Sequence, residues 1–166
     1  MSQRVIAGAW GLQGLVGQKF GVSDWFTVTQ ERIGGFAEVT EDRQWIRCDA
    51  ERARAESPYG TTIADGYLTP PMLSHLLKQA VRVDGPFSGV INYGLNRVCF
   101  PAAVPTGVRV RARCTLQAAE QVPGGLQVTW AVAVECEGAA EAGDGGGEAG
   151  PVLPGHGWEG VRDWLS

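Results

Sequence analysis

The sequence predicts an α+β domain in which an antiparallel sheet wraps one apolar helix. Residues 70–82 carry the longest apolar stripe of the chain, because their large apolar side chains fall on one half of a helical wheel. Residues 108–116 and 126–136 alternate apolar and polar side chains, which is typical of strands with one buried face. The Pro-Gly-Gly turn at 123–125 joins them into a predicted hairpin. The apolar faces of this helix and hairpin can bury each other.

Shorter elements are predicted on either side of the central helix. Thr29 is suited to cap a helix that follows Val28, because its hydroxyl can accept from a free N–H of the first turn. Asp49 is suited in the same way to cap a short helix of good helix formers that ends near 56. Residues 89–93 and 96–100 are predicted to form two short strands.

Glycine is abundant and unevenly spread, with 24 among 166 residues against a usual share of about 7%. We therefore expect an N-terminal extension over 1–14, one folded domain over 15–137 and a glycine-rich loop with a C-terminal segment over 138–166. The first glycines follow no predicted strand, so no phosphate-binding loop is expected there. The final segment has enough apolar residues, Trp158, Val161, Trp164 and Leu165, for a short strand or a docking segment.

The charge and the cysteines exclude several classes of protein. The net charge is −4, whereas a nucleic-acid-binding domain is usually basic. No run of about 20 apolar residues is present, so no membrane span is expected. The N-terminus lacks the apolar core of a signal peptide, and we expect a cytoplasmic protein with reduced thiols. The four cysteines and two histidines have no zinc-binding spacing, so no metal site is expected.

Asp42 is the most interesting carboxylate for catalysis. It follows the first predicted helix and precedes the apolar pair Trp45-Ile46, and a carboxylate beside apolar surface is suited to accept a proton. An ordinary carboxylate at a helix end in water explains the spacing equally well. His75 falls on the polar side of the central helix, which favours a solvent-exposed histidine over a catalytic one.

Three arginines, at 109, 111 and 113, are expected along one face of a strand. A solvated sheet face is the favoured interpretation. The alternative is a grip on a phosphorylated carrier such as coenzyme A. Trp25, Trp45 and Tyr93 are aromatic residues that can line an apolar pocket, although aromatic residues are more often plain core.

Five motifs in the same order along the chain resemble the MaoC-type hydratases, and more narrowly their NodN-like branch. They are LVGQKFGVSDW at 15–25, VTQERI at 28–33, DRQWI at 42–46, IADGYLT at 63–69 and NYGLNRV at 92–98. The resemblance covers about 15–136. It implies a hotdog fold, a homodimer with the active site at the subunit interface, and an acyl thioester carried by coenzyme A or an acyl carrier protein, with no resident cofactor. The reaction that it implies is (R)-specific hydration of a 2-enoyl thioester, or the reverse dehydration.

The resemblance also assigns site residues. Asp42 takes the place of the family's catalytic aspartate, the backbone N–H of Gly66 that of the thioester oxygen donor, and Ser74 that of a supporting serine. We expect contacts with the substrate from four further residues: Asp65, Trp45, Tyr93 and Arg97.

Two family histidines are replaced, by Arg47 and Asp65. Arginine stays protonated in proteins, so Arg47 cannot be a general base, although it can hold an anion through two parallel hydrogen bonds. We expect the two replacements to be linked, with Arg47 and Asp65 forming an ion pair in the pocket. Pro70 and Pro71 are a further departure, since a proline inside a helix kinks it and disfavours helical geometry at Thr69.

The leading functional hypothesis is a hydratase or dehydratase relative that acts on an acyl thioester, including polyketide-like ones, with altered chemistry. Asp42 would move the proton and Arg47 would orient the substrate. One alternative is a non-catalytic subunit that binds acyl groups. The other is a lyase, isomerase or cyclase that uses the carboxylate of Asp42 and the cation of Arg47.

Overall fold

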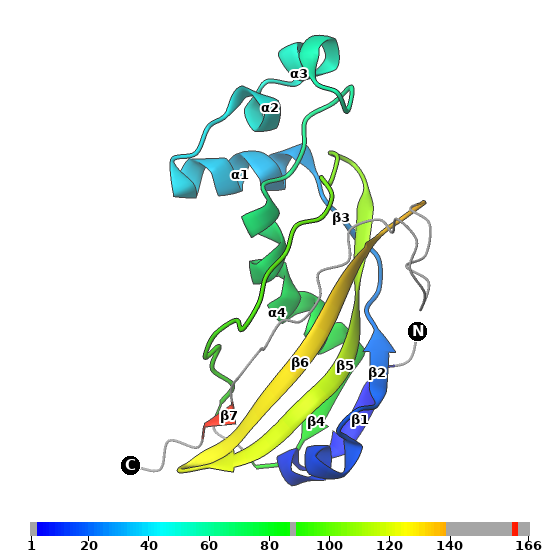
Figure 1. The fold of residues 1–166 in the computed structure, drawn as a ribbon, viewed down its shortest axis with the longest axis vertical. Helices are drawn as coiled ribbons and strands as arrows, with labels where there is room; N and C mark the ends of the chain where they lie inside the picture. Colours follow the sequence, from blue (N-terminus) through cyan, green and yellow to red (C-terminus); the bar gives the residue numbers. More distant parts are fainter. Residues whose placement is uncertain (1–2, 87–88, 139–160, 163–166) are drawn as a thin grey trace.

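The computed structural model describes residues 3–86, 89–138 and 161–162. Its centre is the helix α4 (Thr69–Ala80), which lies across the long strands β5 (Arg109–Val122) and β6 (Gly125–Cys136). The curved sheet wraps this helix, and a group of smaller helices lies beyond one end of it (Figure 1). The predicted α+β arrangement of one apolar helix against a one-faced sheet is therefore present.

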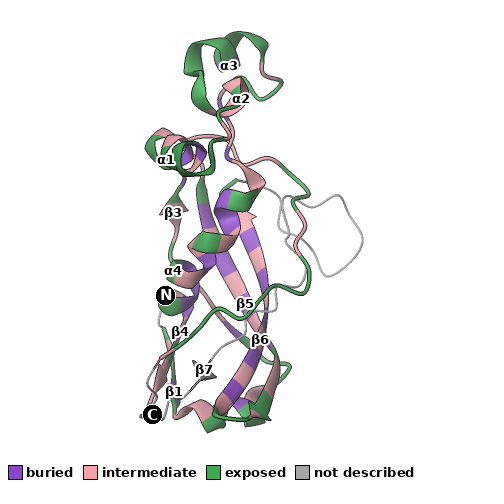
Figure 2. Ribbon diagram, turned by 90° about the vertical axis from the view of Figure 1, so that its left-hand side faces the viewer, coloured by how far each residue is buried: buried purple, intermediate pink, exposed green. Residues whose placement is uncertain are grey.

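The predicted hairpin is the core of the sheet. β5 and β6 pair antiparallel from Val110 opposite Cys136 to Val122 opposite Gly125, with one irregularity between Leu116 and Ala118. Alternate residues of both strands are buried, and these buried stripes face α4 (Figure 2). The period-two pattern predicted this because successive side chains of a strand point to opposite faces.

Further strands extend the sheet or lie beside it. β2 (Lys19–Val22) and β3 (Phe26–Thr27) both pair antiparallel with β5. β7 (Val161–Arg162) pairs with the start of β6, as the apolar residues near the C-terminus predicted. β1 (Arg4–Ala7) and β4 (Val81–Asp84) form a separate two-stranded parallel pair.

The first residues of the chain contribute to the core. β1 is followed by the 3₁₀ helix η1 (Ala9–Leu15), and the side chains of Ile6 and Leu12 are buried in the main apolar cluster. Our expectation that no strand precedes the early glycines is wrong, because Gly8 directly follows β1. Where the folded domain begins along the chain stays a prediction.

The start of the central helix differs from the expected kink. A 3₁₀ turn, η2 (Gly66–Leu68), comes first, and α4 then begins with Thr69 in helical geometry at φ −67° and ψ −46°. The expectation that Pro70 pushes Thr69 out of the helix is therefore wrong. Pro70 and Pro71 lie in the first turn of α4, where backbone N–H groups have no partner within the helix.

Three helices lie beyond the N-terminal end of α4: α1 (Gln30–Thr40), α2 (Trp45–Cys48) and α3 (Ala50–Glu56). The two predicted caps are confirmed. The Thr29 hydroxyl accepts from the N–H of Arg32, and the Asp49 carboxylate accepts from that of Arg52.

The two short strands predicted at 89–93 and 96–100 are wrong. Residues 89–104 run as irregular chain, and Ile91, Tyr93 and Leu95 are exposed. Among the described residues, no strand pairs with this segment, so its alternating pattern does not lead to a strand. The glycine-rich loop expected after residue 137 lies, from 139 to 160, outside the described residues.

The described part of the chain contains neither a membrane-spanning helix nor a cluster of metal-ligating side chains. None of its helices is long and apolar enough to cross a membrane. Within the same residues, no three His, Cys, Asp or Glu side chains gather as metal ligands would. All four cysteines are free, and burial raises the pKa of the Cys114 thiol to about 12.

Candidate active site

A pocket of about 490 Å³ opens at the N-terminal end of the central helix. Its walls come from α2, from the chain that leads into η2, and from the irregular segment at 100–104. Most of the lining is apolar or small, and two charged side chains, Arg47 and Asp65, face into it. A few polar groups in an apolar hollow are typical of small-molecule sites. The lining residues are Gln44, Ile46, Arg47, Tyr59, Ile63, Ala64, Asp65, Gly66, Thr69, Phe100, Pro101, Ala102, Ala103, Val104 and Val134.

Arg47 lies between two carboxylates. Its Nη1 atom contacts Oδ2 of Asp42 and Oδ2 of Asp65. The side chains of Arg47 and Asp65 are 17% and 12% exposed, whereas that of Asp42 is 39% exposed. The predicted ion pair between Arg47 and Asp65 is thus confirmed, and Asp42 joins it. We call these three residues the pocket cluster, and with two carboxylates and one guanidinium its formal charge is −1.

The two carboxylate oxygens of Asp65 contact different partners. Its Oδ1 accepts from the backbone N–H of Tyr67 at 2.7 Å, so it caps η2, while its Oδ2 contacts Arg47. An aspartate at a helix N-terminus is favourable because it satisfies a free N–H of the first turn. Asp65 therefore ties the start of the central helix to α2.

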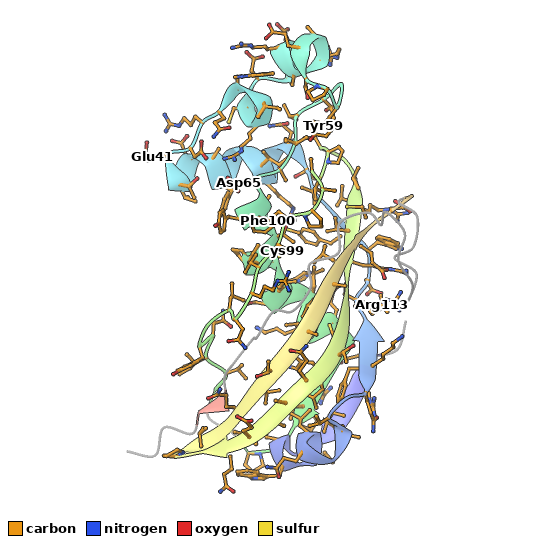
Figure 3. The ribbon with its side chains drawn as sticks, in the orientation of Figure 1. Glu41, Tyr59, Asp65, Cys99, Phe100 and Arg113 are labelled. Atoms are coloured by element: carbon orange, nitrogen blue, oxygen red, sulfur yellow. The ribbon has the colours of Figure 1, made fainter. Side chains whose placement is uncertain are left out.

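Gly66 follows Asp65 and presents bare backbone to the pocket. A Cβ atom built on Gly66 would lie 2.7 Å from the ring of Phe100, so a side chain has no room there. Its N–H donates no hydrogen bond to any residue that the structure describes. Figure 3 shows Asp65 and Phe100 close together near the beginning of α4. A free N–H in a pocket is a donor suited to a carbonyl oxygen of a ligand.

Asp42 contacts the pocket residue Arg47 but does not itself line the pocket, and neither do the remaining predicted site residues. Ser74 lies half-buried two turns further along α4. Trp45 packs its ring against the Arg52 guanidinium, with 4.4 Å between that group and the ring centroid. Tyr93 is 63% exposed, and Arg97 is exposed on the same irregular segment. Roles for these four residues stay predictions.

The three arginines of β5 are paired with carboxylates on the neighbouring strand β6 and directly after it. Nε of Arg111 and Nε of Arg113 each lie 2.7 Å from an oxygen of Glu135, and Arg109 pairs with Glu137. We call these five residues the sheet ladder. Burial opposes ionisation of Glu135, yet the guanidinium groups of Arg113 and Arg111 hold its pKa below the usual range. These pairs disfavour a carrier grip, because the arginines are already paired, but the face is only partly solvated, since the Arg111 side chain is 17% exposed.

Sequence reasoning missed a cluster of three hydrogen-bonded polar side chains that lies outside the pocket lining. Gln30, Thr62 and Thr106 are joined by hydrogen bonds, although they are far apart along the chain. Nothing in the local pattern at 30, 62 or 106 indicates that these side chains meet.

An antiparallel sheet wrapped around a central helix, with a pocket at the helix start, is the hotdog architecture. The chain belongs to the MaoC-like domain family, because the sequence model of that family matches residues 12–136. Among solved structures, an (R)-hydratase of Pseudomonas aeruginosa matches with a TM-score of 0.64 over 89% of this chain and 81% of its own, at 22% identity. A monoamine oxidase regulatory protein from Archaeoglobus has a TM-score of 0.67 at 21% identity, with 99% and 100% of the two chains covered. These likenesses confirm the hotdog fold.

Relatives of higher identity carry names that describe thioester chemistry or nodulation. The 3-hydroxyacyl-thioester dehydratase Z of Mycobacterium tuberculosis is 48% identical over 131 residues, which are 78% of this chain and 85% of that protein. Nodulation protein N of Rhizobium leguminosarum is 42% identical over 123 residues, or 74% and 76% of the two chains. The resemblance to MaoC-type hydratases and to the NodN-like branch is thereby confirmed.

Proposed function

We propose that this chain is a hydratase or dehydratase that interconverts a 2-enoyl and a 3-hydroxyacyl thioester, with chemistry altered at Arg47. The observation that carries the proposal is that Gly66, whose N–H has no partner among the described residues, lines the same pocket as Arg47 and Asp65. A donor for the thioester oxygen next to a polar cluster is what addition of water across an activated double bond requires. The names of the family's relatives support the same reaction class.

In this mechanism the thioester oxygen accepts a hydrogen bond from Gly66, which draws electron density away from C3. Asp42 takes a proton from water while the water oxygen bonds to C3, and a proton is then delivered to C2. Arg47 cannot take the proton. No hydrogen bond joins its Nε or Nη2 to another described residue, so these donors are available to orient the water or the 3-hydroxyl oxygen.

The charge of the site bears on its substrate. The pocket cluster has a formal charge of −1, which disfavours an acyl group that carries a carboxylate. A neutral enoyl or 3-hydroxyacyl group, held on coenzyme A or on an acyl carrier protein, fits this field. No resident cofactor is needed for the reaction.

The test is an assay of crotonyl-coenzyme A hydration, in which turnover is measured as the loss of enoyl absorbance. Wild type is compared with Asp42→Ala and Arg47→His. Arg43→His is the matched control, because Arg43 pairs on the surface with Glu38 and does not line the pocket. Turnover that Asp42→Ala abolishes and Arg43→His preserves supports the proposal. Turnover that depends on Arg47→His would instead show that the present chain has lost the reaction.

A second candidate is a non-catalytic subunit that binds acyl groups. It is favoured by the position of Arg47, which neutralises carboxylates that would otherwise serve as bases. Its signature is a melting temperature that rises with the concentration of crotonyl-coenzyme A, without turnover in wild type or in Arg47→His.

We also propose a homodimer that covers the irregular segment beside the pocket. Several large apolar residues are exposed there or close by, and apolar patches of this kind mark interaction surfaces. They are Tyr67, Val90, Ile91, Tyr93, Leu95 and Phe100. Light scattering should give twice the chain mass, and Tyr93→Glu should shift the protein toward monomer.

A further inference from the structure

The helix that carries Arg47 is only partly buried. None of the four residues of α2 is fully buried, and Trp45, Ile46 and Arg47 are half-buried. Hydrogen bonds to its carbonyl groups also hold it. The N–H of Ile63 donates to the carbonyl of Ile46 at 3.1 Å, and Nε2 of Gln30 donates to the carbonyl of Arg47 at 2.7 Å. α2 also packs against α1 and α3, and these two bonds fix its backbone at Ile46 and Arg47.

The other end of the Gln30 amide is held by two threonines. Its Oε1 accepts from the hydroxyl of Thr62, and from that of Thr106 at 3.2 Å. The two hydroxyl oxygens lie 2.6 Å apart, and the N–H of Thr106 donates to the carbonyl of Thr62 at 2.9 Å. Thr62 is 1% exposed, so this group is shielded from water that would otherwise compete for its bonds.

The orientation of the Gln30 amide follows from its partners. The carbonyl oxygen of Arg47 can only accept, so the amide nitrogen must face it. The amide oxygen must then face the hydroxyl groups, which can donate to it. A flipped amide would place two acceptor oxygens against each other at Arg47.

We propose that Gln30 is a positioning residue of the pocket, which fixes the backbone at Arg47 and thereby the guanidinium of Arg47 against Asp65. It joins three segments that supply pocket walls: α2, the chain from Thr62 into η2, and the chain that ends at Thr106. Gln30 itself does not line the pocket. The catalytic consequence rests on the proposed function, whereas the placement of Arg47 does not.

The test is Gln30→Glu in the full chain, observed through the side-chain nitrogen signals of Arg47. The introduced carboxylate keeps an acceptor for the two threonines but presents oxygen, not N–H, to the Arg47 carbonyl. In wild type the ion pair should hold the guanidinium and give separate, slowly exchanging Nη signals, assigned by their loss in Arg47→Lys. In Gln30→Glu we expect these signals to merge. Gln30→Met, which removes the donor without adding charge, should do the same and serves if Gln30→Glu does not fold.

Thr106→Val is the matched control. It removes a hydroxyl from the same group and lowers the melting temperature, but leaves the bond between Gln30 and Arg47 in place. Merged Arg47 signals in a Gln30 variant, with separate signals in Thr106→Val, support the proposal. Unchanged signals in the folded Gln30 variants, or equal changes in Thr106→Val, overturn it.

This readout needs no substrate, so it separates the proposal from the proposed function. If crotonyl-coenzyme A is hydrated, Gln30→Glu should also lower kcat on the order of ten- to a hundredfold, because a misplaced site group costs that much. Absent hydration in wild type with merged signals in Gln30→Glu would refute the proposed function and leave the positioning role supported.

Discussion

The pocket cluster and the sheet ladder use the same chemical groups in different arrangements. In the pocket cluster one guanidinium, that of Arg47, serves two carboxylates. In the ladder one carboxylate, that of Glu135, serves the two guanidinium groups of Arg111 and Arg113. The guanidinium is the shared group in the pocket cluster, whereas the carboxylate is the shared group in the ladder.

The two regions also differ in the structure that positions their charged side chains. The ladder is built by strand register, since Arg111 pairs directly with Glu135 across β5 and β6 and Arg113 is two residues further along. The pocket cluster has no such frame. Its residues come from the chain before α2, from α2 itself and from the cap of η2, and they meet because separate segments are tied together. Regular structure makes the ladder robust, whereas the pocket cluster depends on single contacts.

Replacing one arginine in each region should give the largest contrast in the free energy of unfolding. Arg47→Met leaves Asp65, with its side chain 12% exposed, beside no counter-charge, and a broken buried pair costs about 3 kcal/mol of unfolding free energy. Arg113→Met, at a side chain that is 38% exposed, should cost within about 1 kcal/mol. Urea unfolding measures both. Adding Asp65→Asn to Arg47→Met should recover much of the loss, and equal losses in the two single variants would contradict this view of the pocket.

The backbone beside the pocket cluster should tolerate an added side chain less well than backbone with open space around it. Gly66→Ala places a Cβ 2.7 Å from the Phe100 ring and should lower the free energy of unfolding by about 1–3 kcal/mol. Gly34→Ala in α1, where a Cβ meets nothing within 4 Å, should raise it by roughly 1 kcal/mol. Thermal unfolding compares the two. A neutral Gly66→Ala would show that Phe100 moves aside easily.

The smallest effect is expected in the ladder and depends on pH. The pKa of Glu135 is lower in the folded chain, so its stabilising contribution is present above the unfolded value of about 4.3 and is lost as the pH falls through the folded value. Glu135→Gln should therefore lower the free energy of unfolding by about 1 kcal/mol at neutral pH. The difference from wild type should vanish in strong acid. A difference that is constant with pH would point to packing instead of charge.

Short sequence patterns correctly predicted the elements that are stabilised by interactions between residues close together in the chain. The caps at Thr29 and Asp49 occur as expected, because a side chain and an N–H three residues away settle them. The strands expected at 89–93 and 96–100 failed, because alternation favours a strand only where a partner strand is present. The position of Pro70 was also misjudged, since the 3₁₀ turn η2 moves the start of α4 so that the proline lies in its first turn.

The candidate site was predictable in part. The resemblance to MaoC-type hydratases brought Asp42, Arg47, Asp65 and Gly66 together, and the ion pair between Arg47 and Asp65 followed from their linked replacement. Gln30 escaped prediction because its bond partners lie 17, 32 and 76 residues away.

The sequence by itself determined the hairpin, the apolar central helix, the helix caps and the family, because periodicity, capping chemistry and ordered motifs are local properties of the chain. Only the tertiary structure decided that one guanidinium would bridge two carboxylates and that an amide from α1 would hold it there. A hydrogen bond or an ion pair acts over a few ångströms of space, whatever the separation along the chain. Its partners are therefore known only once the segments have packed.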